Sequence, residues 1–184
     1  MNKGDSFSSP YIPFSQLEER ARQYAETGGV GTAREQGRQI EWFVFRLCGQ
    51  LFAIPLDCLD EIAPVNPGIR LPGMPSQVMG LMMLRSDTIL LFDLEKVLGT
   101  TRDGPGPPLA ERVVLVFRDR EGRRTGFLAD GIEKPRRLGE GFFEEGPSDA
   151  KTPDSLVDGA GDLEGQSLNR MNTDVLLTTI NNII

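Results

Sequence analysis

Short apolar runs separated by turn-forming residues dominate the chain from residue 41 onward. Six of these runs have the length and the apolar content of β-strands. They lie at 42–47, 51–54, 81–84, 89–92, 112–118 and 124–130. Residues with turn chemistry separate the two runs of each pair, at Gly49-Gln50, Ser86-Asp87 and 119–122. Such spacing predicts a mainly β fold, built as two small barrels or as one sandwich.

Helical elements are predicted to be few and short. Residues 94–98 fit one helical turn that the preceding aspartate caps and Gly99 ends. Pro55 breaks strand pairing, and the apolar spacing of 56–63 fits either a helical turn or a bulged strand. The apolar residues of 174–184 predict a strand or a strand-to-helix element that closes the core.

Residues 1–40 differ in composition from the rest of the chain, being rich in Gly, Ser, Pro, Gln and charged residues. We expect a flexible N-terminal extension here, followed by one folded domain at 41–184. Ser15 and Glu18 form a capping-box pattern, which predicts a short helix at 16–26. This helix either frays in water, as short isolated helices do, or binds a partner.

The segment 139–170 is glycine-rich and strongly acidic. It holds eight acidic and two basic residues, so it carries −6 of the net charge of −7. We expect a solvated loop here, with a partner-facing acidic patch as the alternative.

Charge and hydropathy exclude several classes of function. With 27 acidic and 20 basic residues, the chain is unsuited to nucleic acid and to anionic lipid head groups. No apolar run approaches the roughly 18 residues that a membrane span requires. The polar N-terminus lacks the apolar core of a signal peptide. We therefore expect a cytoplasmic protein with no direct membrane insertion.

Residue types needed for common catalytic and metal sites are scarce. The chain contains no histidine, which removes the most frequent general base and neutral metal ligand. Its two cysteines, Cys48 and Cys58, fit small buried thiols better than a disulfide or a metal site. Phosphate-loop and dinucleotide motifs are absent from the sequence. We predict a protein that is not an enzyme and that has no cofactor.

Arg85 lies at the end of the apolar run 81–84, beside the predicted turn. A guanidinium group stays charged and is too costly to bury in a core without a partner. Arg85 is therefore either a solvated surface residue or a residue that binds a partner.

Four segments, in order along the chain, resemble the CheW-like domain family. They are FVFRLCGQLFAIPLDCLDEI at 43–62, VMGLMMLR at 78–85 with ILLFDL at 89–94, GFLADGIE at 126–133, and LVDGAGDLEG at 156–165. The resemblance covers residues 41–184. It implies two intertwined five-stranded SH3-like β-barrels, with few short helices, around a shared apolar seam.

The resemblance also implies a function and two protein partners. Proteins of this kind are non-catalytic adaptors of chemosensory arrays, which are cytoplasmic or membrane-associated. They couple the cytoplasmic tip of chemoreceptors to the regulatory domain of a CheA-type histidine kinase.

Matching the family's motifs residue by residue gives five candidate partner-binding residues. Arg85, next to Leu84, matches the arginine of the family's Asn-Leu-Arg-Gly turn. Gly80 matches the glycine five positions before that arginine, where another backbone can approach closely. Leu59 and Glu61 match a stretch in the receptor-contacting region.

Met83 and Ser86 depart from the family pattern, which has asparagine and glycine at these positions. Glycine suits a tight turn with positive φ better than serine does, and methionine replaces a polar group with a flexible apolar one. These departures indicate an adaptor of an alternative chemosensory system, such as one for motility. The alternative is a regulatory decoy that binds only the kinase or only the receptor.

Overall fold

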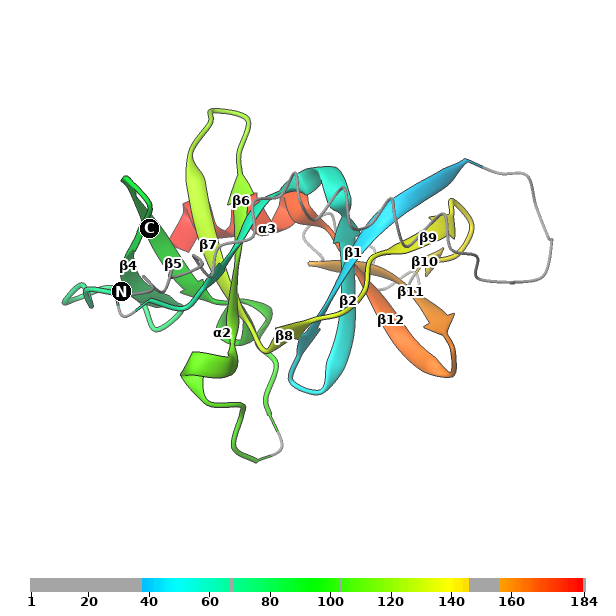
Figure 1. The fold of residues 1–184 in the computed structure, drawn as a ribbon, viewed down its shortest axis with the longest axis horizontal. Coiled ribbons are helices and arrows are strands. Elements are labelled where there is room, and N and C mark those ends of the chain that lie inside the picture. The colour runs from blue at the N-terminus through cyan, green and yellow to red at the C-terminus, as the bar shows by residue number, and fades with distance from the viewer. Residues whose placement is uncertain (1–37, 67, 103, 146–155, 184) are drawn as a thin grey trace, which may run out of the picture.

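The computed structural model describes residues 38–66, 68–102, 104–145 and 156–183. This part of the chain is mainly β and forms two sheets that lie next to each other, with a helix between them (Figure 1). The predicted mainly β fold is therefore confirmed. The helix predicted at 16–26 lies outside the described residues.

The first sheet has five strands in the order β3-β6-β7-β5-β4. Neighbouring strands are antiparallel except β5 and β7, which are parallel. The strands are β3 (Leu59–Pro64), β4 (Val78–Leu84), β5 (Asp87–Asp93), β6 (Val113–Arg118) and β7 (Arg124–Ala129).

The second sheet has seven strands, in the order β10-β11-β12-β2-β1-β8, with β9 also paired to β1. They are β1 (Gln39–Leu47), β2 (Gln50–Pro55), β8 (Gly131–Ile132), β9 (Arg136–Gly139), β10 (Glu144–Glu145), β11 (Val157–Leu163) and β12 (Gln166–Met171). This number exceeds the expected five, because residues 131–145 add three short strands to the four longer strands β1, β2, β11 and β12. Since β3–β7 interrupt this sheet in sequence, the two halves are intertwined as expected.

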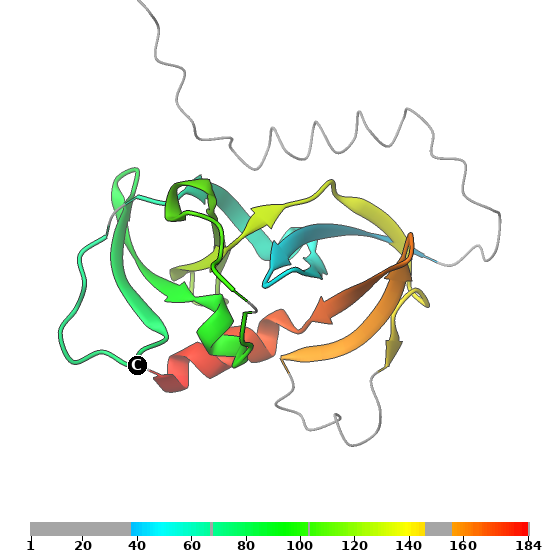
Figure 2. The ribbon, with the colours of Figure 1, turned by 90° about the horizontal axis from the view of Figure 1, so that it is seen from below.

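Four helices within the described residues connect or flank the strands: η1 (Leu56–Cys58), α2 (Leu94–Leu98), η2 (Leu109–Glu111) and α3 (Thr173–Ile183). Gly99, with φ of +67°, ends α2 as predicted. Asp93 takes the position before α2, but its carboxylate pairs with Lys96 at 3.3 Å and accepts no capping hydrogen bond from the backbone. The C-terminal segment is a helix, which extends from β12 toward the five-stranded sheet (Figure 2).

The ambiguous segment 56–63 contains both predicted alternatives in succession. A single helical turn, η1, follows Pro55, and β3 then begins with a register shift between Leu59 and Glu61. The apolar spacing could not separate these alternatives because each occupies only part of the segment.

The prediction of a solvated loop over 139–170 is wrong for much of the segment. Residues 157–171 form the β11–β12 hairpin. Its acidic residues lie between inward positions that pack into the sheet, such as Gly159 and Leu168, which are buried. The acidic composition hid this alternation, because small glycines occupy inward positions where apolar side chains were expected.

Three apolar clusters fill the fold. One, including Met82, Leu84 and Val116, lies within the five-stranded half, and another, including Trp42 and Leu168, lies within the seven-stranded half. The third and largest joins side chains of both sheets and α3. It corresponds to the expected shared apolar seam.

The two halves repeat one structural pattern. In each, a hairpin begins with a register shift, between Val78 and Gly80 in β4 and between Val157 and Gly159 in β11. The second strand of each hairpin then pairs in parallel with a strand of another hairpin and leads into a helix. Strand β5 pairs with β7 and leads into α2, and β12 pairs with β2 and leads into α3. The β4–β5 and β11–β12 turns are therefore equivalent positions in the two halves.

Candidate functional site

The β4–β5 turn holds Arg85 in a defined position. Leu84 pairs with Asp87, which leaves Arg85 and Ser86 as a two-residue turn, one residue earlier than predicted. Arg85 has a φ of +57°, a conformation that glycine adopts more readily than other residues. The positive φ that a glycine would permit at the position after the arginine is here taken by the arginine itself.

Arg85 forms an ion pair across the five-stranded half. Its guanidinium Nη2 lies 3.0 Å from Oε1 of Glu61 on β3. Because β3 and β4 are opposite edges of the sheet, this contact requires the sheet to curl on itself. The Arg85 side chain remains 53% exposed, whereas that of Glu61 is 5% exposed. The pair therefore joins a buried anchor to an accessible cation.

Glu61 is the one buried charged residue among those the structure describes. Its Oε2 accepts a hydrogen bond of 2.5 Å from Arg124 on β7. Its Oε1 is buried and lies near Arg85 without hydrogen-bond geometry. A buried carboxylate is costly unless it is paired, so the two arginines hold Glu61 in place and Glu61 holds Arg85 in return.

Arg124 organises the charges around this pair. It donates to Asp60 at 2.8 Å and to Asp87 at 2.9 Å, and Asp60 also accepts from Arg118 at 3.1 Å. Burial disfavours the charge of Arg124, but its bonds to Asp87 and Glu61 outweigh burial and raise its pKa. The sequence analysis did not identify Arg124 as a site residue. The feature that could have indicated it is its position opposite Arg118 in the β6–β7 hairpin.

The other three predicted partner-binding residues are buried. Leu59 and Leu84 belong to the apolar clusters. Gly80 is also buried, with φ of +139°, and a Cβ atom there would lie 2.2 Å from the carbonyl oxygen of Ile69. The close backbone approach expected at Gly80 is therefore made by the chain itself. A role of these three residues in binding stays a prediction. Because they are buried, they would affect a partner through the shape of the surface above them.

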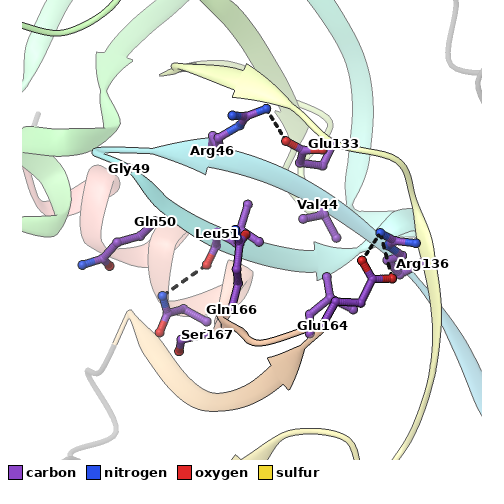
Figure 3. Close-up of a pocket in the computed structure, with 12 residues that line it drawn as sticks. Val44, Arg46, Gly49, Gln50, Leu51, Glu133, Arg136, Glu164, Gln166 and Ser167 are labelled. Atoms are coloured by element: carbon purple, nitrogen blue, oxygen red, sulfur yellow. Dashed lines mark hydrogen bonds and ion pairs between the residues drawn. The ribbon is translucent and has the colours of Figure 1, made fainter.

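A second polar site lies in the seven-stranded half, where a cavity of about 760 Å³ opens beside β1, β2 and the β11–β12 hairpin (Figure 3). Arg46 pairs with Glu133 at its edge, and Arg136 lies 3.5 Å from Glu164. Glu164 occupies the turn position equivalent to Arg85, and it also has positive φ. The β4–β5 turn thus supplies the cation of its ion pair, whereas the β11–β12 turn supplies the anion.

The described residues include two free thiols and no group of potential metal ligands. Across the four described ranges, no three residues of the types His, Cys, Asp and Glu are grouped to hold a metal ion. Cys48 and Cys58 are free thiols, and burial raises the pKa of both. None of the described helices is long and apolar enough to cross a membrane.

Comparison with known proteins gives consistent results. The CheW-like domain family matches residues 41–181. A probable chemotaxis protein CheW of Rhizobium etli is 28% identical over 92 residues, which are 50% of this chain and 57% of that protein. The chain thus matches little more than half of this relative's length.

A solved structure supports the fold over a larger region. The crystal structure of the scaffolding protein TtCheW from Thermoanaerobacter tengcongensis superposes with a TM-score of 0.63 at 18% identity. The match covers 73% of this chain and 90% of that one. With the family match over most of its length, the chain belongs to the CheW-like domain family.

Proposed function

We propose that this protein is an adaptor that couples the cytoplasmic tip of chemoreceptors to the regulatory domain of a CheA-type histidine kinase. The surface around Arg85 makes the contact. The carrying observation is that Arg85 is held by buried Glu61 while about half of its side chain remains accessible. The proposed location is the cytoplasm, at membrane-associated or cytoplasmic receptor arrays.

The geometry of Arg85 suits a protein interface. Arginine binds carboxylates or carbonyls through a planar fork, and it is enriched among residues that dominate interface energies. Fixing the side chain before binding reduces the entropy lost on association. Arg124 also binds Glu61 but is engaged by Asp60 and Asp87 and is only 13% exposed, so Arg85 is the arginine at Glu61 that a partner can reach.

The departures at Met83 and Ser86 support an adaptor of an alternative chemosensory system, such as one serving motility. Met83 is largely exposed on β4, two residues before Arg85, so a partner that binds Arg85 can also contact its apolar group. The positive φ of Arg85 gives this turn a shape of its own. A partner matched to this surface need not bind a family member with asparagine and glycine there.

Substitution of Arg85 by alanine will weaken binding to at least one partner by about 2 kcal/mol, roughly a 30-fold rise in Kd. Titration calorimetry of the full chain against the kinase regulatory domain and the receptor tip, each alone, measures this. Alanine is preferable to glutamate, which would place a second carboxylate beside buried Glu61. Since Arg124 still pairs with Glu61, the variant should lose only about 1 kcal/mol of stability.

Arg120→Ala is the matched control, because Arg120 lies in the β6–β7 turn and is highly exposed, with a 3.5 Å pair to Asp174. It should bind both partners normally. Wild-type binding to only one partner would favour the decoy, and wild-type binding to neither would refute the proposed function. Equal affinities of wild type and Arg85→Ala would remove Arg85 from the interface.

A further inference from the structure

Two large apolar side chains lie exposed on β4 and on the segment paired with it, near the turn that holds Arg85. Ile69 is 72% exposed and Met83 is 68% exposed, the highest values among the large apolar residues that the structure describes. Isolated exposed apolar residues are ordinary, but adjacent ones on a rigid surface indicate an interaction site. The relevant question is therefore whether these two side chains are neighbours.

Strand pairing places Ile69 and Met83 on one face. Ile69 forms a bridge with Leu81, with reciprocal backbone hydrogen bonds of 2.8 and 2.9 Å. Met83 lies two residues beyond Leu81 on β4, so Met83 and Leu81 point to the same face of the sheet. Met82, between them, points to the other face and is fully buried. Ile69 and Met83 are thus diagonal neighbours, within reach of each other's long side chains.

Rigid backbone supports this pair. Gly68 and Gly80 allow the segment at 69 to approach β4 so closely that a Cβ atom on either glycine would clash with the opposite carbonyl. Beneath Met83 lies the packed cluster that contains Met82 and Leu84. The apolar pair is therefore presented by an ordered platform, which lowers the entropic cost of docking.

A cation lies next to the apolar pair. Arg85 follows Met83 after one residue, and its side chain is 53% exposed. A partner that covers the pair meets apolar surface bordered by positive charge. The complementary surface is an apolar side chain with a carboxylate next to it.

We infer that Ile69 and Met83 form an apolar specificity contact for the partner that Arg85 binds. Its occupant is a protein segment that presents an apolar side chain beside an acidic one. This inference rests on the proposed function and extends it, because it names the chemistry that selects the partner. A polar residue at either position would remove the apolar contact and leave the arginine contact in place.

The test uses the full chain with Met83→Asn, Ile69→Asn and the double variant. Each is titrated against the purified kinase regulatory domain and, separately, the purified chemoreceptor tip. Burying one such side chain at an interface corresponds to about a tenfold change in Kd. We expect each single variant to weaken binding of the same one partner about tenfold, with a larger loss in the double variant.

Leu109→Asn is the control, since Leu109 is an exposed apolar residue on η2, before the start of β6, whereas the Arg85 network meets the end of β6 at Arg118. It should bind as wild type does. If the double variant binds both partners with wild-type affinity while Arg85→Ala does not, the inference fails and the proposed function stands. If wild type binds neither partner, the proposed function fails first.

A second copy of the chain is the competing occupant. Sedimentation velocity of wild type and the double variant distinguishes it, because self-association through this pair would be lost on substitution. A wild-type dimer that the double variant converts to monomer, without a change in partner affinity, overturns the inference. Monomeric behaviour of both, together with the partner-specific loss, supports it.

Discussion

Replacing Gly80 with alanine will destabilise the protein by roughly 3 kcal/mol or more, the largest effect expected of a single added methyl group here. Two causes act together. Gly80 has φ of +139°, which side-chain-bearing residues rarely adopt, and its Cβ would lie 2.2 Å from the carbonyl oxygen of Ile69. Because Leu81 donates a hydrogen bond to that same oxygen, relieving the clash would lengthen the bond that holds the 69 segment.

Two other glycines separate these causes. At Gly68 a Cβ would lie 2.2 Å from the Leu81 carbonyl oxygen, with no positive φ, so Gly68→Ala isolates the clash. Gly122 has φ of +83° and open space around it, so Gly122→Ala isolates the backbone strain and should cost about 1 kcal/mol. Urea unfolding measures all three. A Gly80→Ala variant no less stable than Gly122→Ala would contradict the close approach.

Local sequence patterns predicted much of this fold because the strands are short and their turns carry recognisable residues. The strand pairs around residues 47–50, 84–87 and 118–124, and the helix α2 with Gly99 at its end, formed as expected. Both turns of the first two hairpins lie one residue earlier than predicted. Turn position depends on which residue can take positive φ, and Cys48 and Arg85 do so against their intrinsic preference.

Features that depend on contacts far apart in sequence could not be predicted. Glu61 can be buried because Arg85 of the β4–β5 turn and Arg124 of β7 pair with it. No local sequence pattern predicts these contacts. The sequence left open whether Arg85 is a solvated surface residue or a residue that binds a partner, and the structure bears on this choice. The residue is accessible, yet it is also fixed by a buried carboxylate, which a freely solvated arginine would not be.

Substituting asparagine for Asp130 should destabilise the protein by about 3 kcal/mol, because it removes the charge that pairs with the largely buried side chain of Arg102. Asp130 lies between β7 and β8, where the chain passes from one sheet to the other. Its carboxylate accepts hydrogen bonds from both terminal nitrogens of Arg102, at 2.8 and 2.9 Å, and from the Cys48 backbone N–H at 2.8 Å. Arg102 also pairs with Glu95 of α2 at 2.9 Å.

The arrangement explains the size of the effect. The Asp130 side chain is 10% exposed and that of Arg102 is 13% exposed, so water can replace little of what is lost. The same carboxylate connects the β1–β2 turn of one sheet with α2 beside the other sheet through Arg102. Losing it should loosen the junction of the two halves as well as lower global stability.

The effect should depend on pH with a definite sign. Burial alone would raise the pKa of Asp130, but hydrogen bonds from Arg102 and from the Cys48 N–H outweigh it and lower the pKa. A lowered pKa in the folded state contributes stability above the unfolded-state value of 3.8, which is lost as pH falls through the folded-state value. The stability difference between wild type and Asp130→Asn should therefore be full at about pH 7 and shrink below about pH 4.

Urea unfolding of both proteins at about pH 7 and about pH 3 measures this difference. Asp174→Asn is the control, because Asp174 is highly exposed and pairs only loosely with exposed Arg120, at 3.5 Å. It should cost less than about 1 kcal/mol at either pH. A stability loss for Asp130→Asn no larger than that of Asp174→Asn, or one that grows on acidification, would show that Asp130 does not hold the junction as an ionised carboxylate.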